Sequence, residues 1–476
     1  MIWLARVLCV YGALALAGCA TYTSQTEKMR ADWAAGNAAS ASREAEDFAK
    51  SSADSGDALV WFLEAGAAAR ADGKLKESIG HFDAAFKLVE RYESEAEIRL
   101  GQETAAIFTN QSFIPYKGYN YDKIMMSVYQ ALNHIEAKEF DAAAVDLKRL
   151  ENFQASAERK NAGDIENRMR ALDEESAKRG AVGASSYLYN PSVNSALRRA
   201  YGDKFPQSAR QQAKGVYVNP YAYWVGGLYF ANRPEDISDK NRAADLFRFA
   251  AQMLGGKSGP LNEDARAAGM LASGLITKFP ATTYVVYEAG CAPVRKQIRV
   301  DIPLSIVGRG LPYVGVNFPY LDFQNFHRGD LSVMAGGKKY AFDTVADMDE
   351  IIKREFDSEF PYVVAKTIIS AGVKAAAEYA ASQAAGDYWW IAAIVGGIYQ
   401  AATNDADLRT WTTLPKQIRI ARLPTPEDGK LSIDGKVVEL VPGCTNVVLV
   451  KRMSAGGKLI IRRFDFNDKM TTKDKI

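Results

Sequence analysis

The chain has 476 residues, of which 48% are hydrophobic and 24% charged, and its formal net charge is only +2. This composition is that of a folded globular protein and excludes a disordered stalk. The balanced charge gives no reason to expect nucleic acid as a partner. The length leaves room for roughly two to four domains and more than one hydrophobic core.

Residues 1–18 have the features of a secretory signal sequence, which ends just before a cysteine. Arg6 supplies a positive charge, residues 7–17 form an apolar run too short to span a bilayer, and Leu16-Ala17-Gly18-Cys19 closes it with small residues. This tetrapeptide resembles the bacterial lipobox. The resemblance implies cleavage before Cys19, a diacylglyceryl thioether on its sulfur and an acyl chain such as palmitate on its amine. Ala20 stands where an aspartate would retain the protein in the inner membrane, so the implied location is the outer membrane, facing the periplasm.

Two cysteines remain once the signal peptide is removed and Cys19 is lipidated, namely Cys291 and Cys444. In an oxidising compartment we expect a disulfide between them, and the alternative is two unpaired thiols. The bridge would close a loop of about 150 residues, worth roughly 4 to 5 kcal/mol in the chain-entropy treatment.

Residues 19–55 are rich in Ala, Ser, Glu and Lys, and we expect a lipidated tether that becomes helical. From Leu59 to Arg91 the residues follow a helix-turn-helix template of about 34 positions. Its small residues let two helices approach closely, and its phenylalanines fill the groove between them. The template residues are Phe62, Gly66, Gly73, Ser78, Phe82 and Ala85.

This template resembles a tetratricopeptide repeat, and two further copies follow. The second covers residues 122–153, with Ala131, Phe140, Ala143, Leu147 and Leu150 at equivalent places; the looser third covers residues 224–250, with Trp224, Gly227, Leu228, Ala243, Phe247 and Ala250. We therefore predict a TPR-like α-solenoid over residues 56–280. The alternative is ordinary α-helical packing.

Residues 180–215 mix Gly, Ser, Asn and Pro with several tyrosines and show no helical period, so they are predicted to form a long loop. Tyr187, Tyr189 and Tyr201 would fasten this loop to the helices or line a groove on the concave side of the solenoid.

Near Thr282 the hydrophobic pattern changes from a helical period to alternating apolar and polar residues, which predicts strands. Residues 281–343 and 416–466 are expected to form two halves of one β-sandwich-like domain, so the fold class is α+β. Its strands are predicted at residues 283–287, 296–300, 304–307, 313–318, 416–420, 430–433, 437–441, 445–451 and 458–464. Residues 467–476 form a tail.

An insertion, residues 344–415, separates the two halves. Residues 362–385 predict a helix with a narrow polar stripe, and residues 388–402 predict a second apolar helix that carries Trp389 and Trp390. Three interpretations stay open for this hairpin: burial against its own domain, a contact surface for a partner or for other copies of the chain, and a shallow dip into the membrane. Ile369 and Val373 share one helix face, and with the two tryptophans they are the candidate interaction surface.

After the hairpin comes Ala406-Asp407-Leu408-Arg409-Thr410-Trp411-Thr412-Thr413-Leu414-Pro415. This decapeptide resembles the Asp-x-Arg-x-Trp-x-x-Leu-Pro segment of a family of large, poorly characterised Gram-negative outer-membrane lipoproteins with a TPR-like front half. The resemblance implies a non-enzymatic role in envelope assembly and partners such as small lipoproteins similar to activators of penicillin-binding proteins. Physically, Arg409 and Trp411 would fix the exit of the hairpin to the sheet, and we prefer this structural role for Asp407, Arg409 and Trp411 to ligand binding.

Catalytic and metal-binding patterns are weak. The chain has three histidines, His81, His134 and His327, without cysteine or carboxylate neighbours at ligand spacing, and it contains no phosphate-binding or dinucleotide-binding motif. The acidic run around Asp347, Asp349 and Glu350 leaves a carboxylate-based hydrolase as one alternative. We expect no cofactor and no metal, and a periplasmic scaffold or adaptor that acts through protein-protein contacts. The other alternative is a subunit of a secretion or surface-structure assembly.

Overall fold

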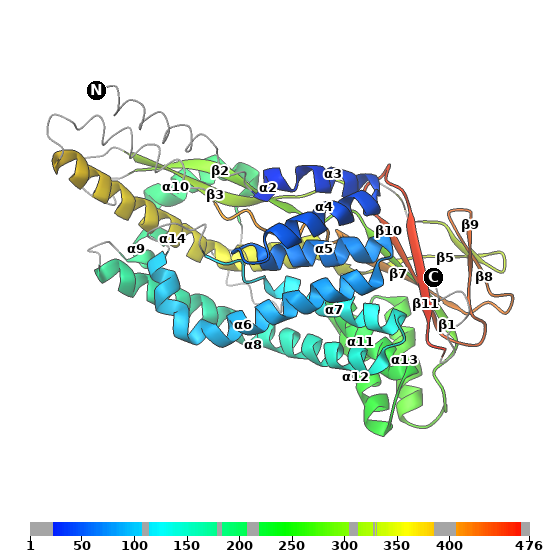
Figure 1. Cartoon of the computed structure of the whole chain (residues 1–476). Coiled ribbons are helices and arrows are strands. Elements are labelled where there is room, and N and C mark those ends of the chain that lie inside the picture. The colour runs from blue at the N-terminus through cyan, green and yellow to red at the C-terminus, as the bar shows by residue number, and fades with distance from the viewer. Residues whose placement is uncertain are drawn as a thin grey trace.

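The computed structural model describes residues 22–106, 114–178, 183–206, 219–303, 313–326, 329, 331–384 and 406–467. Helices dominate the N-terminal part of this mixed α/β protein and strands its C-terminal part (Figure 1). The helices are α2 (Tyr22–Gln25), α3 (Glu27–Ala35), α4 (Ala38–Ser51), α5 (Ala58–Asp72), α6 (Leu75–Ala106), α7 (Asn120–Glu136), α8 (Phe140–Lys178), α9 (Ala184–Leu188), α10 (Pro191–Tyr201), α11 (Pro220–Asn232), α12 (Ile237–Met253), α13 (Gly259–Ala272) and α14 (Met348–Ala384). The strands are β1 (Thr282–Ala289), β2 (Val294–Pro303), β3 (Tyr313–Asp322), β4 (Val333–Ala335), β5 (Lys338–Tyr340), β6 (Asp343–Asp347), β7 (Gln417–Pro424), β8 (Lys430–Ile433), β9 (Lys436–Glu439), β10 (Asn446–Arg452) and β11 (Ile460–Asp465).

The three predicted helical repeats are three helical hairpins, α5 with α6, α7 with α8, and α11 with α12. Glycine sets the approach of the two helices in the first and the last. A Cβ atom on Gly66 would lie 2.7 Å from the Phe82 ring, and one on Gly227 would lie 2.8 Å from the Phe247 ring. Both phenylalanines are fully buried. The expected close approach of small residue and ring is therefore confirmed in two hairpins.

The strands form one five-stranded sheet and two smaller ones. The order of the large sheet is β11-β10-β1-β7-β6, with β1 antiparallel to β7 and parallel to β10. Strands β2 and β3 pair as a long two-stranded ribbon, and the third sheet has the order β5-β4-β8-β9. Because β1 lies between β7 and β10, the two halves predicted on either side of the insertion do meet in one sheet.

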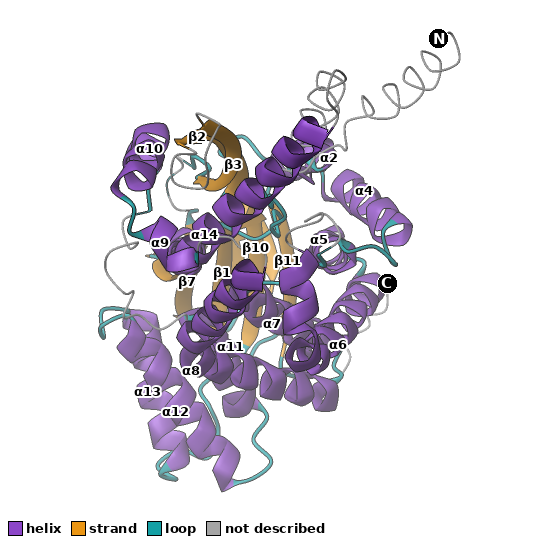
Figure 2. Ribbon diagram, turned by 90° about the vertical axis from the view of Figure 1, so that its left-hand side faces the viewer, coloured by secondary structure: helices purple, strands orange, loops and turns teal. Residues whose placement is uncertain are grey.

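The large sheet is covered on both faces, which explains why every residue of β1 is buried. Tyr284 and Val286 belong to the main core, which continues into the helices, whereas Val285 and Tyr287 belong to a second core shared with the third sheet. Helices lie in front of the sheet in Figure 2. The described body thus has three layers: helices, the five-stranded sheet and the four-stranded sheet.

The helical structure expected within residues 19–55 is present, but from Tyr22 onward these helices belong to the folded body and do not form a tether. Helices α2, α3 and α4 each contribute buried side chains to the main core, among them Tyr22, Trp33 and Ala45. Ser454 Oγ, from the turn after β10, donates to the carbonyl of Ala34 at 2.7 Å. An alanine-rich stretch looks weakly apolar, but its small side chains allow close packing against a large neighbouring surface.

Other boundaries also differ from the predictions. Part of the expected loop 180–215 is helical, because Asn190 caps α10 by accepting from the N–H groups of Ser192 and Val193 and Pro191 opens the helix. Strand β6 and the first turns of α14 occupy the start of the predicted insertion. Helix α14, predicted from residue 362, begins at Met348 and runs through Pro361. The predicted strand 304–307 and the second hairpin helix 388–402 lie outside the described residues.

The predicted disulfide between Cys291 and Cys444 is absent, and both thiols are free. The parallel pairing of β1 and β10 explains this result. Thr283 is level with Asn446 and Ala289 with Arg452, so Cys444 lies just before one end of the strand pair and Cys291 just beyond the other. At about 3.3 Å per residue the two are roughly 30 Å apart, and a disulfide requires Cα atoms within about 7 Å.

The close contact of Gly66 with the Phe82 ring predicts opposite effects for two alanine substitutions on the α5–α6 hairpin. Gly66→Ala forces the Phe82 ring to move and should lower the free energy of unfolding by about 1 to 3 kcal/mol. Gly80→Ala, on α6 with no atom within 4 Å of the new Cβ, should raise it by up to about 1 kcal/mol through helix propensity. Denaturant unfolding of both variants checks this expectation, and two changes of the same sign would contradict it.

Candidate functional site

An open groove of about 720 Å³ lies where the α11–α12 hairpin meets the edge of the large sheet and the start of α14. Its apolar wall includes Phe249 and Met253, one helical turn apart on α12 and 46% and 38% exposed. The ring of Tyr223 on α11 lies beside that of Phe249, with 6.1 Å between the centroids. Large apolar side chains exposed together in a concave site are typical of a binding surface.

Strand β6 forms the opposite wall of the groove. Among the described strands it is an edge strand of the five-stranded sheet. Met348 N–H donates to the carbonyl of Lys416, next to β7. Because backbone groups alternate along an antiparallel pair, the N–H of the preceding residue, Asp347, points away from β7. Thr344 is exposed at the same wall. An edge strand beside an apolar hollow can pair with an extended peptide.

The rim of the groove carries two carboxylates, Asp347 and Glu350, and one guanidinium, Arg354. Asp347 accepts from Gln417 Nε2 at 2.9 Å and from the N–H of Glu350. Asp349, in the same acidic run, forms an ion pair with Lys416. Burial raises the pKa of Asp349 to about 6, although Lys416 opposes the rise. The acidic run considered for catalysis therefore holds the start of α14 to β7.

The decapeptide 406–415 is a second site, which we call the latch. Arg409 donates to both carboxylate oxygens of Asp407 at 2.9 and 2.8 Å, and also to Asp57 Oδ1 at 2.9 Å and to the carbonyl of Ile114 at 3.0 Å. Burial alone would raise the pKa of Asp407, but the Arg409 guanidinium holds that pKa below its usual range. Such a bidentate pair fixes the geometry of the segment.

The next latch residues enter the helical core. The Trp411 side chain is fully buried, edge-on to Tyr129 of α7 with 5.8 Å between the centroids, and its Nε1–H donates to Thr413 Oγ1 at 2.8 Å. Glu64 of α5 accepts four hydrogen bonds from the latch, from the N–H and hydroxyl groups of Thr412 and Thr413. The sequence predicts attachment of the latch to the sheet, whereas its side chains attach chiefly to α5, α6 and α7.

The other predicted site residues do not gather at either site. Ile369 is buried and Val373 is half-buried, and both pack against the main core, so these two do not form an exposed interaction surface. Trp389 and Trp390, the rest of that candidate surface, lie outside the described residues, as does Cys19.

Buried carboxyl groups where α14 meets α7 were not predicted from the sequence. Glu355 of α14 caps α7 by accepting from the N–H groups of Asn120 and Tyr121 at 2.7 and 3.3 Å. Burial, followed by the negative charge of Glu359, raises the pKa of Glu355 to about 8. Burial likewise raises the pKa of Asp122 to about 7. A cap that lies more than 230 residues away along the chain leaves no local signal.

In the ranges that the structure describes, no group of three or more His, Cys, Asp or Glu side chains is placed to hold a metal ion. No helix in these same ranges is both long enough and apolar enough to cross a membrane. A scan of family models, a search of curated proteins and a search of solved structures each found no match to this chain.

The pKa of Glu355 predicts a pH-dependent stability. A carboxyl whose folded pKa is above its unfolded pKa binds more protons in the folded state, so stability falls as pH rises from about 4.3 to about 8. Glu355→Gln removes the titration and keeps one acceptor oxygen. We expect this variant to match the wild type near pH 4.5 and to exceed it by a few kcal/mol above pH 8. Unfolding curves from pH 4.5 to 9 test this, and a difference that does not change with pH would contradict it.

Proposed function

We propose that this protein is a non-enzymatic outer-membrane lipoprotein that acts as a periplasmic scaffold in cell-envelope assembly, and that it binds an extended segment of a partner protein in the groove between α12 and β6. The observation that carries the proposal is the pairing of exposed Phe249 and Met253 with an edge strand across one hollow. The lipobox at residues 16–19 supplies the anchor.

The residues that line the groove indicate what kind of partner segment it would bind. Its backbone would pair with β6, where the N–H of Asp347 is directed outward, and alternate side chains would reach the apolar wall on α12. Two carboxylates against one guanidinium at the rim favour a segment with a basic side chain over an acidic one. The occupant is therefore an extended, apolar segment with at least one basic residue.

The helical hairpins support the same proposal. We interpret them as irregular TPR-like repeats whose stacking builds a rigid surface, and the groove lies against the last of them, α11–α12. Two carboxylates beside the groove have structural partners, since Asp347 bonds Gln417 and Asp349 pairs with Lys416. This arrangement supports binding in preference to acid-base chemistry.

Site-specific photo-crosslinking tests the groove. A photoreactive residue at Thr344 should capture a partner in intact cells, and the captured peptide should map to one apolar, basic segment. Phe249→Glu with Met253→Glu should reduce the capture several-fold without changing the melting temperature, because both side chains are exposed. Binding of the synthetic segment to the purified protein should weaken by the same factor.

Val145→Glu is the matched control, since Val145 is an equally exposed apolar residue on α8. It should leave both capture and binding unchanged. Undiminished capture in the double glutamate variant would contradict the proposal, as would capture of copies of this chain alone.

A further inference from the structure

We propose that the α2–α3 end of the protein rests on the membrane surface and that the groove opens on the opposite side. This inference rests on the proposed lipid anchor at Cys19. Three peptide units separate Cys19 from Tyr22, and fully extended they span at most roughly 11 Å. The anchored cysteine therefore lies within that distance of the folded body.

Tyr22 cannot swing away from the body to lengthen the connection. Its side chain is 6% exposed, and its hydroxyl donates to Glu64 Oε1 at 2.8 Å. The hydroxyl of the next residue, Thr23, donates to the carbonyl of Arg295 at 3.1 Å, and the Thr23 carbonyl accepts from the Arg30 guanidinium at 3.0 Å. These bonds join α2, α3 and the start of β2 into one surface at the point where the chain leaves for the membrane.

A stack of helices separates this surface from the groove. Contacts run in succession from α3 to α4, α5, α7, α11 and α12. Five steps of 8–10 Å between packed helix axes give a path of at most roughly 40 to 50 Å from α3 to α12. Helices α2 and α3 lie at the top of Figure 1 and α12 and α13 at the bottom, and Figure 2 keeps the same order after its turn about the vertical axis. With the anchor at the top, the groove beside α12 lies on the side of the molecule that is farther from the membrane.

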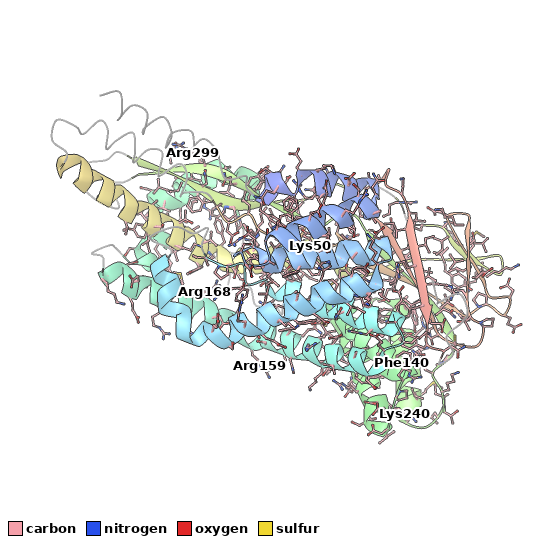
Figure 3. All side chains as sticks on the ribbon, viewed as in Figure 1. Lys50, Phe140, Arg159, Arg168, Lys240 and Arg299 are labelled. Atoms are coloured by element: carbon pink, nitrogen blue, oxygen red, sulfur yellow. The ribbon has the colours of Figure 1, made fainter. Side chains whose placement is uncertain are left out.

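The upper surface is polar, which suits contact with lipid headgroups. The side chains of Lys28 on α3 and Arg299 on β2 are each 70% exposed. Lys28 forms surface ion pairs with Asp32 and Glu44, and Arg299 forms one with Asp301. Figure 3 places Arg299 on the upper edge of the molecule and Lys240 of α12 on its lower edge. Because surface ion pairs are weak, these cations of the upper surface can also meet the phosphates of anionic lipid. The membrane contact is therefore superficial, and the groove stays open to a periplasmic partner.

Short-range quenching on vesicles tests the orientation. The full lipidated chain with Cys291→Ala and Cys444→Ala receives one fluorescent cysteine at Lys28, at Arg299 or at Ile237, a residue of α12 that is 58% exposed. Each protein is bound to phosphatidylethanolamine–phosphatidylglycerol vesicles that contain a lipid with a nitroxide on its headgroup. We expect at least a several-fold loss of fluorescence at positions 28 and 299 and almost none at 237. Equal quenching at all three positions, or stronger quenching at 237, would overturn the orientation.

Flotation separates this inference from the proposal on which it rests. The lipidated protein should float with vesicles, and Cys19→Ser should abolish flotation. If the lipidated protein does not float, the anchor and the orientation are both refuted. If it floats and position 237 is quenched, only the orientation is refuted.

Discussion

The described structure depends on one buried carboxylate, that of Glu64, which joins three distant parts of the chain. It accepts five hydrogen bonds, from Tyr22 near the N-terminus and from the backbone and side chains of Thr412 and Thr413 in the latch. Burial raises the pKa of Glu64, and these donors oppose the rise. Removing such an acceptor would leave several buried donors without a partner, and each unpaired donor costs about 1 to 3 kcal/mol.

This interaction explains why the N-terminal helices and the C-terminal strands share one core. The latch follows the long excursion through α14, and it returns to helices α5–α7 before the chain enters β7. With Trp411 between Tyr129 and Phe82, and Arg409 tied to Asp57, the segment joins both halves. The start of β7 is thereby fixed against the helices, and β7 in turn pairs with β6, the strand that lines the groove. A wall held in this way loses little conformational entropy when a partner binds.

The sequence predicts those features that depend on neighbours along the chain. Gly66 with Phe82 predicts a tight hairpin, and alternation near Thr282 predicts β1. Features that depend on distant partners escape it. The two cysteines that remain after processing, Cys291 and Cys444, suggest a disulfide. Only the parallel pairing of β1 with β10 shows that they lie at opposite ends of this strand pair. The helix predicted from residue 362 begins at Met348, because burial of its apolar face on both sides of Pro361 carries α14 through the proline. The groove is lined by residues of α11, α12, β6 and α14, so no local sequence pattern predicts it.

The free energy of unfolding of Glu64→Gln tests most directly whether this carboxylate holds the two halves of the chain together. The amide nitrogen would face donors in place of an acceptor oxygen, so we expect a loss of roughly 2 to 5 kcal/mol. Glu77→Gln on α6, an exposed site, is the control and should change stability by less than about 0.5 kcal/mol. A Glu64→Gln protein as stable as the control would contradict the claim that this carboxylate holds the two halves together.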